Sequence, residues 1–388
     1  MEKYIVLRDL SLGSRQFKRG ALSKSGAKSQ LKIEVENVPS YALAELRNDP
    51  QVRSAEPAMG TRLISPFNVK PTVEAKTDAW GIAATGADLS PYTGEGVTVA
   101  VLDTGIDIDH PAFEGVLLDF EDFTASGKHD GNGHGTHCAG TIFGRDVDGH
   151  RIGVARGIKN ALIGKVLDDD GNGSSEMIFQ ALQWAFRKQA NIISMSLGFD
   201  FPGTVRHKVE AGWPVDLATS QALEAYRGNL RMFDALMSVF KAQKAFNGSP
   251  IVIAAAGNES RRDLNAEYNI AASVPAAADG VISVAAAYQL DATYGIADFS
   301  NSLAHCAAPG VNILSAWPKG TLQLLDGTSM ACPHVAGVAA LWWERAVRER
   351  APIVSEAVYS QLTSTDRKRF AAQFNSSDFG FGFVSAPI

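Results

Sequence analysis

The chain has 388 residues, of which 45% are hydrophobic and 20% charged, and its formal net charge is −6 at pH 7. This is the composition of an ordinary globular protein, and the net negative charge argues against a protein whose partner is nucleic acid. The chain has no run of 18 apolar residues that would predict a membrane-spanning helix, and its three cysteines are too few, and odd in number, for a disulfide framework.

The N-terminal part of the chain, residues 1–64, predicts a small α+β domain. Residues 3–10 and 31–38 have strand patterns, and the second of them alternates apolar and charged residues as a half-buried strand does. Residues 39–48 have apolar positions on one side of a short helix, and a weaker strand pattern follows at 51–55.

A polar, proline-containing stretch follows, and we interpret residues 65–79 as a linker to a larger domain at 80–388. In this larger domain, buried-strand patterns alternate with helix patterns. The alternation predicts an α/β fold with a doubly wound, mainly parallel sheet that helices cover on both faces. The clearest elements are strands at 97–106, 161–167 and 190–197 and helices at 174–188 and 335–348.

Three stretches of the larger domain carry side chains suited to nucleophilic catalysis. One buried strand ends in Asp103, and α/β sheets place their sites at this end of a strand. In GHGTHCAGT, glycines and other small residues surround His134 and leave room for a neighbouring backbone. In DGTSMACPHVAG, Ser329 lies at a helix start, where free N–H groups favour developing negative charge. Taken alone, the last stretch also fits a capped helix of the core.

The start of that last helix has further expected features. Gly327 permits a close backbone approach, and Thr328 or Ser329 can serve as the helix N-cap. Pro333 costs little if it lies within the first four helical positions, because its missing N–H would have no partner there.

In the order Asp103, His134 and Ser329, the three stretches resemble the subtilisin-like serine proteases. The resemblance implies that Ser329 is the nucleophile, His134 the general base and acid, and Asp103 the carboxylate that orients the imidazolium. His137 is then structural. Cys138 is either a small buried hydrophobe or a competing nucleophile, and the first is favoured because Ser329 already has the family's nucleophile position.

The resemblance also implies an oxyanion hole and a peptide-binding cleft. Asn258, in the motif AAAGN, would donate its side-chain amide to the tetrahedral intermediate, with the Ser329 backbone N–H as second donor. Two strands would form the cleft and bind a peptide or protein substrate between them by β-augmentation. The cleft residues implied are Ser196, Leu197 and Gly198 on one strand, Gly171 to Gly173 on the other, and Ala255 and Gly257 beside the oxyanion hole.

The N-terminal domain resembles the inhibitory propiece of the same family, with the loop 11–30 in place of its first helix. An unrelated extension that only packs on the catalytic domain is the alternative. We expect residues from about Met59 to Ile64 to enter the cleft, so that the segment acts as an intramolecular inhibitor of a zymogen. Residues 1–65 carry 11 Lys and Arg against 7 Asp and Glu, a net of +4, which leaves 25 against 35, or −10, for the remainder. The two charges are complementary.

The start of the chain, with Glu2, Lys3, Arg8 and Asp9, does not have the pattern of a signal peptide. This favours a cytoplasmic enzyme. Inhibitory propieces are nevertheless more typical of secreted relatives, so secretion stays open.

About 20 residues, 199–217, are inserted relative to the family, before a lengthened helix at 219–246. The insertion follows a cleft strand, so we expect it at the rim of the cleft, as a wall or lid that selects substrate or as a surface insertion without that role.

No cofactor and no metal ion are expected. At the position of an aspartate in the family's tight calcium site this chain has Ala112, and the turn 145–151 that should complete the site holds Arg145 and Arg151. The acidic loop 168–173 begins like a calcium-binding hand, but the twelfth position, Phe179, offers no oxygen ligand.

The sequence thus predicts a serine endopeptidase. A catalytically silent, peptide-binding member of the family is the alternative, and a nucleotide-binding module is disfavoured because the turn after Asp103 has no phosphate-binding glycine pattern. The preferred side chain of the substrate is open, since Glu259 and the pair Arg261 and Arg262 could bias it either way.

Overall fold

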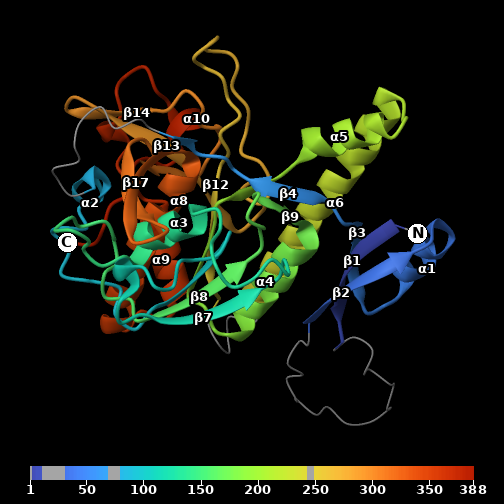
Figure 1. Ribbon diagram of the computed structural model, residues 1–388, viewed down its shortest axis with the longest axis horizontal. Coiled ribbons are helices and arrows are strands. Elements are labelled where there is room, and N and C mark those ends of the chain that lie inside the picture. Colours follow the sequence, from blue (N-terminus) through green and yellow to red (C-terminus); the bar gives the residue numbers. More distant parts are fainter. Residues whose placement is uncertain (1, 11–30, 69–78, 243–248) are drawn as a thin grey trace, which may run out of the picture.

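The computed structural model describes residues 2–10, 31–68, 79–242 and 249–388. The predicted loop 11–30 and most of the predicted linker therefore lie outside the described residues. In Figure 1 a small N-terminal domain lies beside a large body that contains the central sheet, and the long helix α6 (Val215–Ala242) runs between them.

The N-terminal domain is a three-stranded antiparallel sheet in the order β2, β1, β3 with a short helix. Side chains alternate along β1: Tyr4 and Val6 pack toward the domain's own helix, whereas Ile5 and Leu7 join the core of the large body. The domain is thus held to the body by one face of its sheet. Its elements are β1 (Glu2–Asp9), β2 (Leu31–Val38), η1 (Ser40–Ala42), α1 (Leu43–Asn48) and β3 (Val52–Pro57), close to the predicted bounds.

The large body is built on a central sheet in the order β14, β13, β12, β10, β6, β8, β7, with β15 also pairing with β13. All of its strand pairs are parallel except β13 with β14. This confirms the predicted α/β, mainly parallel sheet. The strands are β6 (Thr98–Asp103), β7 (Leu117–Asp122), β8 (Asn160–Lys165), β10 (Ile192–Met195), β12 (Ile251–Ala255), β13 (Val281–Leu290), β14 (Thr293–Ile296) and β15 (Cys306–Pro309).

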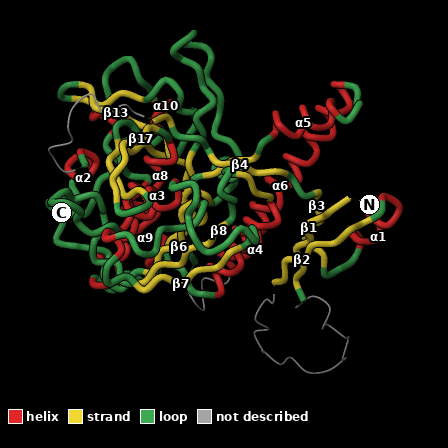
Figure 2. The backbone as a smooth tube through the Cα atoms, in the orientation of Figure 1, coloured by secondary structure: helices red, strands yellow, loops and turns green. Residues whose placement is uncertain are grey.

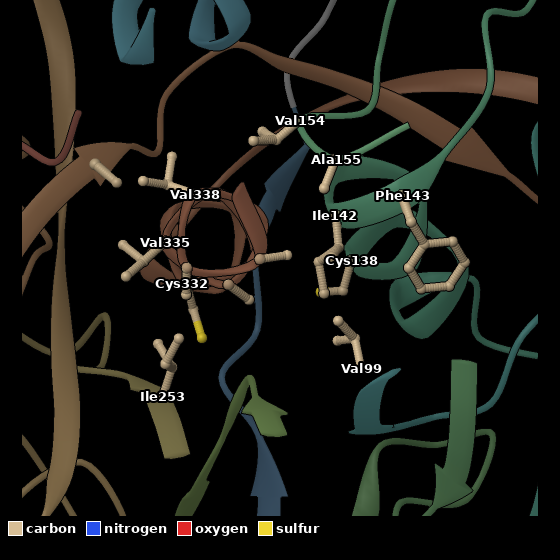
Figure 3. Close-up of a cluster of buried hydrophobic side chains, with 14 of the residues drawn as sticks. Val99, Cys138, Ile142, Phe143, Val154, Ala155, Ile253, Cys332, Val335 and Val338 are labelled. Atoms are coloured by element: carbon tan, nitrogen blue, oxygen red, sulfur yellow. The ribbon is translucent and has the colours of Figure 1, made fainter. Parts of the chain in front are cut away.

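Helices cover both faces of this sheet, as the strands and helices of Figure 2 show. Along β6, Val99 and Val101 point to a core shared with α3 (His134–Phe143) and α8 (Thr328–Arg348), whereas Ala100 and Leu102 point to a core shared with α4 (Ser175–Arg187) and α6. Figure 3 shows the first core, where Cys332, Val335 and Val338 of α8 gather with side chains of α3 and of the sheet. Because both faces of β6 are buried, its sequence is apolar from Val99 to Leu102 without alternation.

The remaining elements complete the body and its rim. They are β4 (Gly60–Leu63), β5 (Phe67–Asn68), α2 (Trp80–Thr85), η2 (Pro111–Phe113), β9 (Asn172–Ser174), β11 (Leu197–Phe199), α5 (Phe201–Glu210), β16 (Ile313–Trp317), β17 (Thr321–Asp326), α9 (Val354–Leu362), η3 (Arg367–Arg369) and α10 (Ser376–Phe379). Among the described residues, no helix is both long and apolar enough to cross a membrane.

Two predictions of local structure were incomplete. Residues 67–68, assigned to the linker, are a strand that pairs with β17, because Leu325 and Asp326 offer them an open edge. The insertion 199–217 is not irregular: α5 fills most of it, and α6 begins at Val215 rather than at residue 219. In Figure 1 the two helices form a hairpin that projects from the body.

Candidate active site

Asp103 and His134 form a buried pair. Asp103 is the last residue of β6 and His134 the first of α3, and the His134 Nδ1 lies 2.7 Å from Asp103 Oδ1. The Thr104 N–H also donates to that oxygen at 2.8 Å, which fixes the carboxylate. Since a carboxylate accepts only, Nδ1 carries the proton and Nε2 is left as an acceptor. The His134 Nε2 is buried and has no hydrogen-bond partner.

Ser329 is the second residue of α8, and here two expectations are corrected. The N-cap is Gly327, and no side chain caps the helix. Pro333 is the sixth helical residue, beyond the first turn, so its ring removes a hydrogen bond to the Ser329 carbonyl. Side chains replace that bond: Ser196 Oγ donates to Ser329 O at 3.2 Å and Cys138 Sγ at 3.4 Å.

Cys138 therefore has a structural role beside the candidate triad. It is 1% exposed, and burial raises the pKa of its thiol well above the usual range, with the Asp103 charge adding to the effect. A thiol held protonated is a poor nucleophile. The structure thus favours the buried-hydrophobe interpretation of Cys138 over the competing nucleophile.

Asn258 follows β12, and its amide orientation is fixed by Thr328. The Thr328 N–H and hydroxyl both donate to Asn258 Oδ1, at 2.9 and 2.8 Å, so Nδ2 points the other way. There Nδ2 donates to Ser65 O at 3.1 Å. Gly257 N–H donates to the Thr328 hydroxyl at 3.2 Å and completes the network. Thr328 was not among the predicted site residues, although its place next to Ser329 was a usable signal.

The predicted cleft strands are brought together around β4. Leu197 and Gly198 of β11 pair with Leu63 and Arg62, and Gly173 of β9 pairs with Thr61, all antiparallel. The blue β4 lies between elements far from it in sequence (Figure 1). The contact extends to Gly171, whose carbonyl accepts from Leu63 N–H at 2.8 Å, and Ala255 shares a buried core with Ile64.

At the end of β4, the chain passes the candidate nucleophile. Ser329 Oγ donates to Ile64 O at 3.0 Å and lies 3.5 Å from Ser196 O. The Ile64 side chain is 3% exposed, and a Cβ on Gly198 would meet it at 3.5 Å. Ser329, Asn258 and the two cleft strands thus contact one short segment, whose backbone runs through the site.

Two other buried histidines give the protein an expected pH dependence. Burial, together with the His134 charge, lowers the pKa of His137 to about 3, and burial lowers the pKa of His334 to about 4. In the unfolded chain both titrate near pH 6.5, so below that pH the unfolded state binds more protons and stability is lost as the pH falls. Each group contributes about 1.4 kcal/mol per pH unit in this range.

We therefore expect the free energy of unfolding to fall by roughly 4 to 5 kcal/mol between pH 6.5 and pH 4.5. Urea unfolding of the Ser329→Ala chain at four pH values between 7.5 and 4.5 measures it without self-digestion. A urea midpoint that stays constant over this range would contradict the buried, neutral state of His137 and His334.

The predicted loss of the tight calcium site also has a structural basis. Ala112 is fully buried and offers no side-chain oxygen. The Arg145 guanidinium donates to Phe143 O at 3.0 Å and to Ile158 O at 2.8 Å, and it also contacts Arg156 O. A fixed cation, Arg145, thus lies beside the buried Ala112, which offers no side-chain oxygen, and these residues do not fit a calcium ion.

We expect that adding a chelator leaves the melting temperature unchanged. A tightly bound ion stabilises the folded state by mass action, so its removal would lower the melting temperature by several degrees. A fall of that size on adding EDTA, reversed by excess calcium, would show that a cation is held despite Arg145 and Ala112.

Two carboxylates of the acidic loop 168–173 are held by hydrogen bonds within the protein. Asp168 Oδ1 accepts from Asp170 N–H and Asn172 N–H, and Asp169 accepts from Lys165 Nζ at 2.6 Å. Lys165 is fully buried and also donates to Thr104 O at 2.6 Å, so it links the acidic loop to the end of β6 at Asp103. This buried lysine was missed by sequence analysis, because an isolated Lys at a strand end gives no signal of burial.

Comparison with known proteins agrees with this geometry. The family model described as the subtilase family matches residues 94–383. Subtilisin-like protease 6 of Trichophyton soudanense is 32% identical over 360 residues, which cover 85% of this chain and 75% of that protein. Subtilisin-like serine protease Pen c 1 of Penicillium citrinum is 33% identical over 314 residues, 76% of this chain and 65% of that protein. The chain therefore belongs to the subtilase family and is a subtilisin-like serine endopeptidase.

Proposed function

We propose that this endopeptidase acts through Ser329, His134 and Asp103, with Asn258 in the oxyanion hole. Ser329 Oγ attacks the substrate carbonyl while His134 Nε2 takes its proton, and Asp103 holds the Nδ1–H tautomer and stabilises the imidazolium. Asn258 Nδ2 and the Ser329 N–H are the donors to the oxyanion. His134 then protonates the leaving amine, and a water molecule hydrolyses the acyl-enzyme by the reverse proton transfers.

The observation that carries this proposal is the buried Asp103–His134 pair with its partnerless Nε2, next to a serine in a strand-lined cleft. Replacing Asp103 with asparagine tests it, because the amide would favour the wrong tautomer of His134 and lower kcat by about 10⁴. The rate is measured with an internally quenched peptide of sequence Gly-Thr-Arg-Leu-Ile-Ser-Pro. An unchanged kcat in the folded Asp103→Asn protein would rule out the proposed role.

We further propose that the chain is a zymogen and that its N-terminal segment occupies the cleft as a substrate-like inhibitor. The support is β4, which adds a strand between β9 and β11 as a peptide substrate would. The hydroxyl of Ser329 donates to Ile64 O, and His134 Nε2 has no hydrogen-bond partner, so the two groups do not share a proton here. Asn258 Nδ2 contacts the next carbonyl, that of Ser65. These contacts fit a blocked site better than a reacting one.

The N-terminal domain has its own contacts on the body that support this role. Asn229 Nδ2 of α6 donates to Pro57 O at 3.0 Å, and Lys3 Nζ lies 3.0 Å from Glu176 of α4. Gly228 lets Glu56 approach α6, since a Cβ there would meet Glu56 Oε2 within 2.2 Å. The domain thus anchors β4 at the cleft from a separate surface, which raises the effective concentration of the inhibitory segment.

A further inference from the structure

The Arg62 side chain of β4 contacts two acidic residues that lie outside the cleft strands β9 and β11. The carbonyl of Ile64 lies at Ser329 Oγ, so the peptide bond after Ile64 is the one at the nucleophile. Arg62 is the third residue before that bond, after Ile64 and Leu63. Its neighbours Thr61 and Leu63 are buried, at 3% and 9% exposure. The Arg62 side chain is 40% exposed, and its guanidinium lies 3.5 Å from Asp200 Oδ1 and 3.8 Å from Glu259 Oε1.

The two acids reach Arg62 from two different segments. Asp200 follows β11 and is the N-cap of α5, where it accepts from Gly203 N–H at 2.9 Å. Its own N–H donates to Gly60 O at 3.1 Å, at the start of β4. The insertion therefore places one carboxylate at the cleft, which gives this part of the chain a specific role in contacting the bound strand.

Glu259 is held as firmly on the other side. Its Oε2 accepts from Asn301 Nδ2 at 2.8 Å, which leaves Oε1 toward Arg62. Gly257 makes room for this arrangement, since a Cβ there would meet Glu259 Oε2 at 2.4 Å, and its φ of +115° also favours glycine. Because both carboxylates are fixed by the protein, little side-chain entropy is lost when a cation binds between them.

We propose that Asp200 and Glu259 form an acidic subsite that selects a lysine or arginine at the third residue before the cleaved bond, in substrates as well as in the segment. This rests on the proposed function, because the position is counted from the bond at Ser329. The subsite is partly exposed, so each ion pair has a modest effect. Two pairs together predict a preference of about 3- to 10-fold for Arg over Gln, and a bias against Glu.

The first test compares quenched peptides Gly-Thr-Xaa-Leu-Ile-Ser-Pro with Xaa as Arg, Lys, Gln or Glu, using the full-length protein. The ratio of kcat/KM for Arg over Gln is expected at about 3 to 10 and should decrease as salt is added. In the double variant Asp200→Asn, Glu259→Gln the ratio should fall to about 1, while asparagine keeps the N-cap of α5. Asp263→Asn, whose carboxylate contacts Arg261 at 3.0 Å instead, is the control.

Equal kcat/KM values for Arg and Gln in the wild type, or a preference retained in the double variant, would overturn the proposal. A second test needs no catalysis. It measures the amide hydrogen exchange of residues 60–63 in the full-length Ser329→Ala protein, where the exchange rate reports how often β4 opens. Arg62→Gln and the double acid variant should each raise the exchange rate by about 3- to 10-fold, and combining them should add nothing. Arg53→Gln, which removes a contact to Asp9, should leave it unchanged.

The two tests separate the two proposals. If a folded Ile64→Asp protein, in which the segment is expected to leave the cleft, neither cleaves peptide nor reacts with a serine-reactive probe, the proposed function fails. Exchange of β4 then still decides whether the acids bind Arg62. Unchanged exchange in Arg62→Gln would show that the two ion pairs contribute nothing to holding the strand, and the subsite would be rejected.

Discussion

Replacing Ser329 with alanine is expected to remove essentially all peptide hydrolysis, because the proposed mechanism then has no nucleophile to form the acyl-enzyme. Asn258→Ala should keep the nucleophile and lose one oxyanion donor. The expected loss is about 10²- to 10³-fold in kcat, the magnitude known for the equivalent donor of subtilisin. Both values are measured with the quenched peptide under saturating conditions.

The control is Ser376→Ala, which replaces an exposed serine at the start of α10. It should leave kcat unchanged, and thermal unfolding should show that all three variants are folded. Full peptidase activity in the Ser329→Ala protein would reject the assignment of the nucleophile.

Replacing Ile64 with aspartate is expected to activate the full-length protein. The Ile64 side chain is 3% exposed in the cleft, and an unpaired carboxylate there costs several kcal/mol. The segment should therefore leave the cleft more often, and the initial rate of peptide hydrolysis should rise by about 10²-fold for each roughly 3 kcal/mol lost. Tyr41→Asp is the control, because Tyr41 lies in the same domain and is 86% exposed.

The same account predicts inhibition in trans. Residues 1–65, added to a catalytic domain that begins near Thr72, should inhibit hydrolysis of the quenched peptide, and the Ile64→Asp segment should inhibit far less. Tethering supplies an effective concentration in the millimolar range, so the free segment needs higher amounts than the covalent one. An active catalytic domain that is not inhibited at tens of micromolar segment would reduce the N-terminal domain to a structural extension.

Much of the fold could be predicted because its determinants are local. Strand β6 is apolar on both faces and ends in Asp103, and His134 and Ser329 each lie within the first two residues of a helix beside small residues. Such patterns depend on residues that are close in sequence, so these elements can be predicted from a single sequence. The order of the three side chains then identified the family, which the comparisons confirm.

The parts that sequence analysis missed depend on contacts between distant residues. Residues 67–68, near the start of the predicted linker, form β5 only because β17 offers them a partner strand. Pro333 is tolerated in α8 because Ser196 and Cys138 donate to the carbonyl that it leaves free. Likewise, Asp200 and Glu259 are far apart in sequence and meet only at Arg62. Contacts between residues so far apart in sequence cannot be predicted from a local sequence pattern.

The most direct test of the account is covalent labelling with a serine-reactive fluorophosphonate, followed by peptide mass spectrometry. We expect one adduct, on Ser329, that forms slowly in the full-length protein and much faster in Ile64→Asp, and that is lost in His134→Ala. An Ile64→Asp protein that is folded but carries no adduct on Ser329 would contradict it.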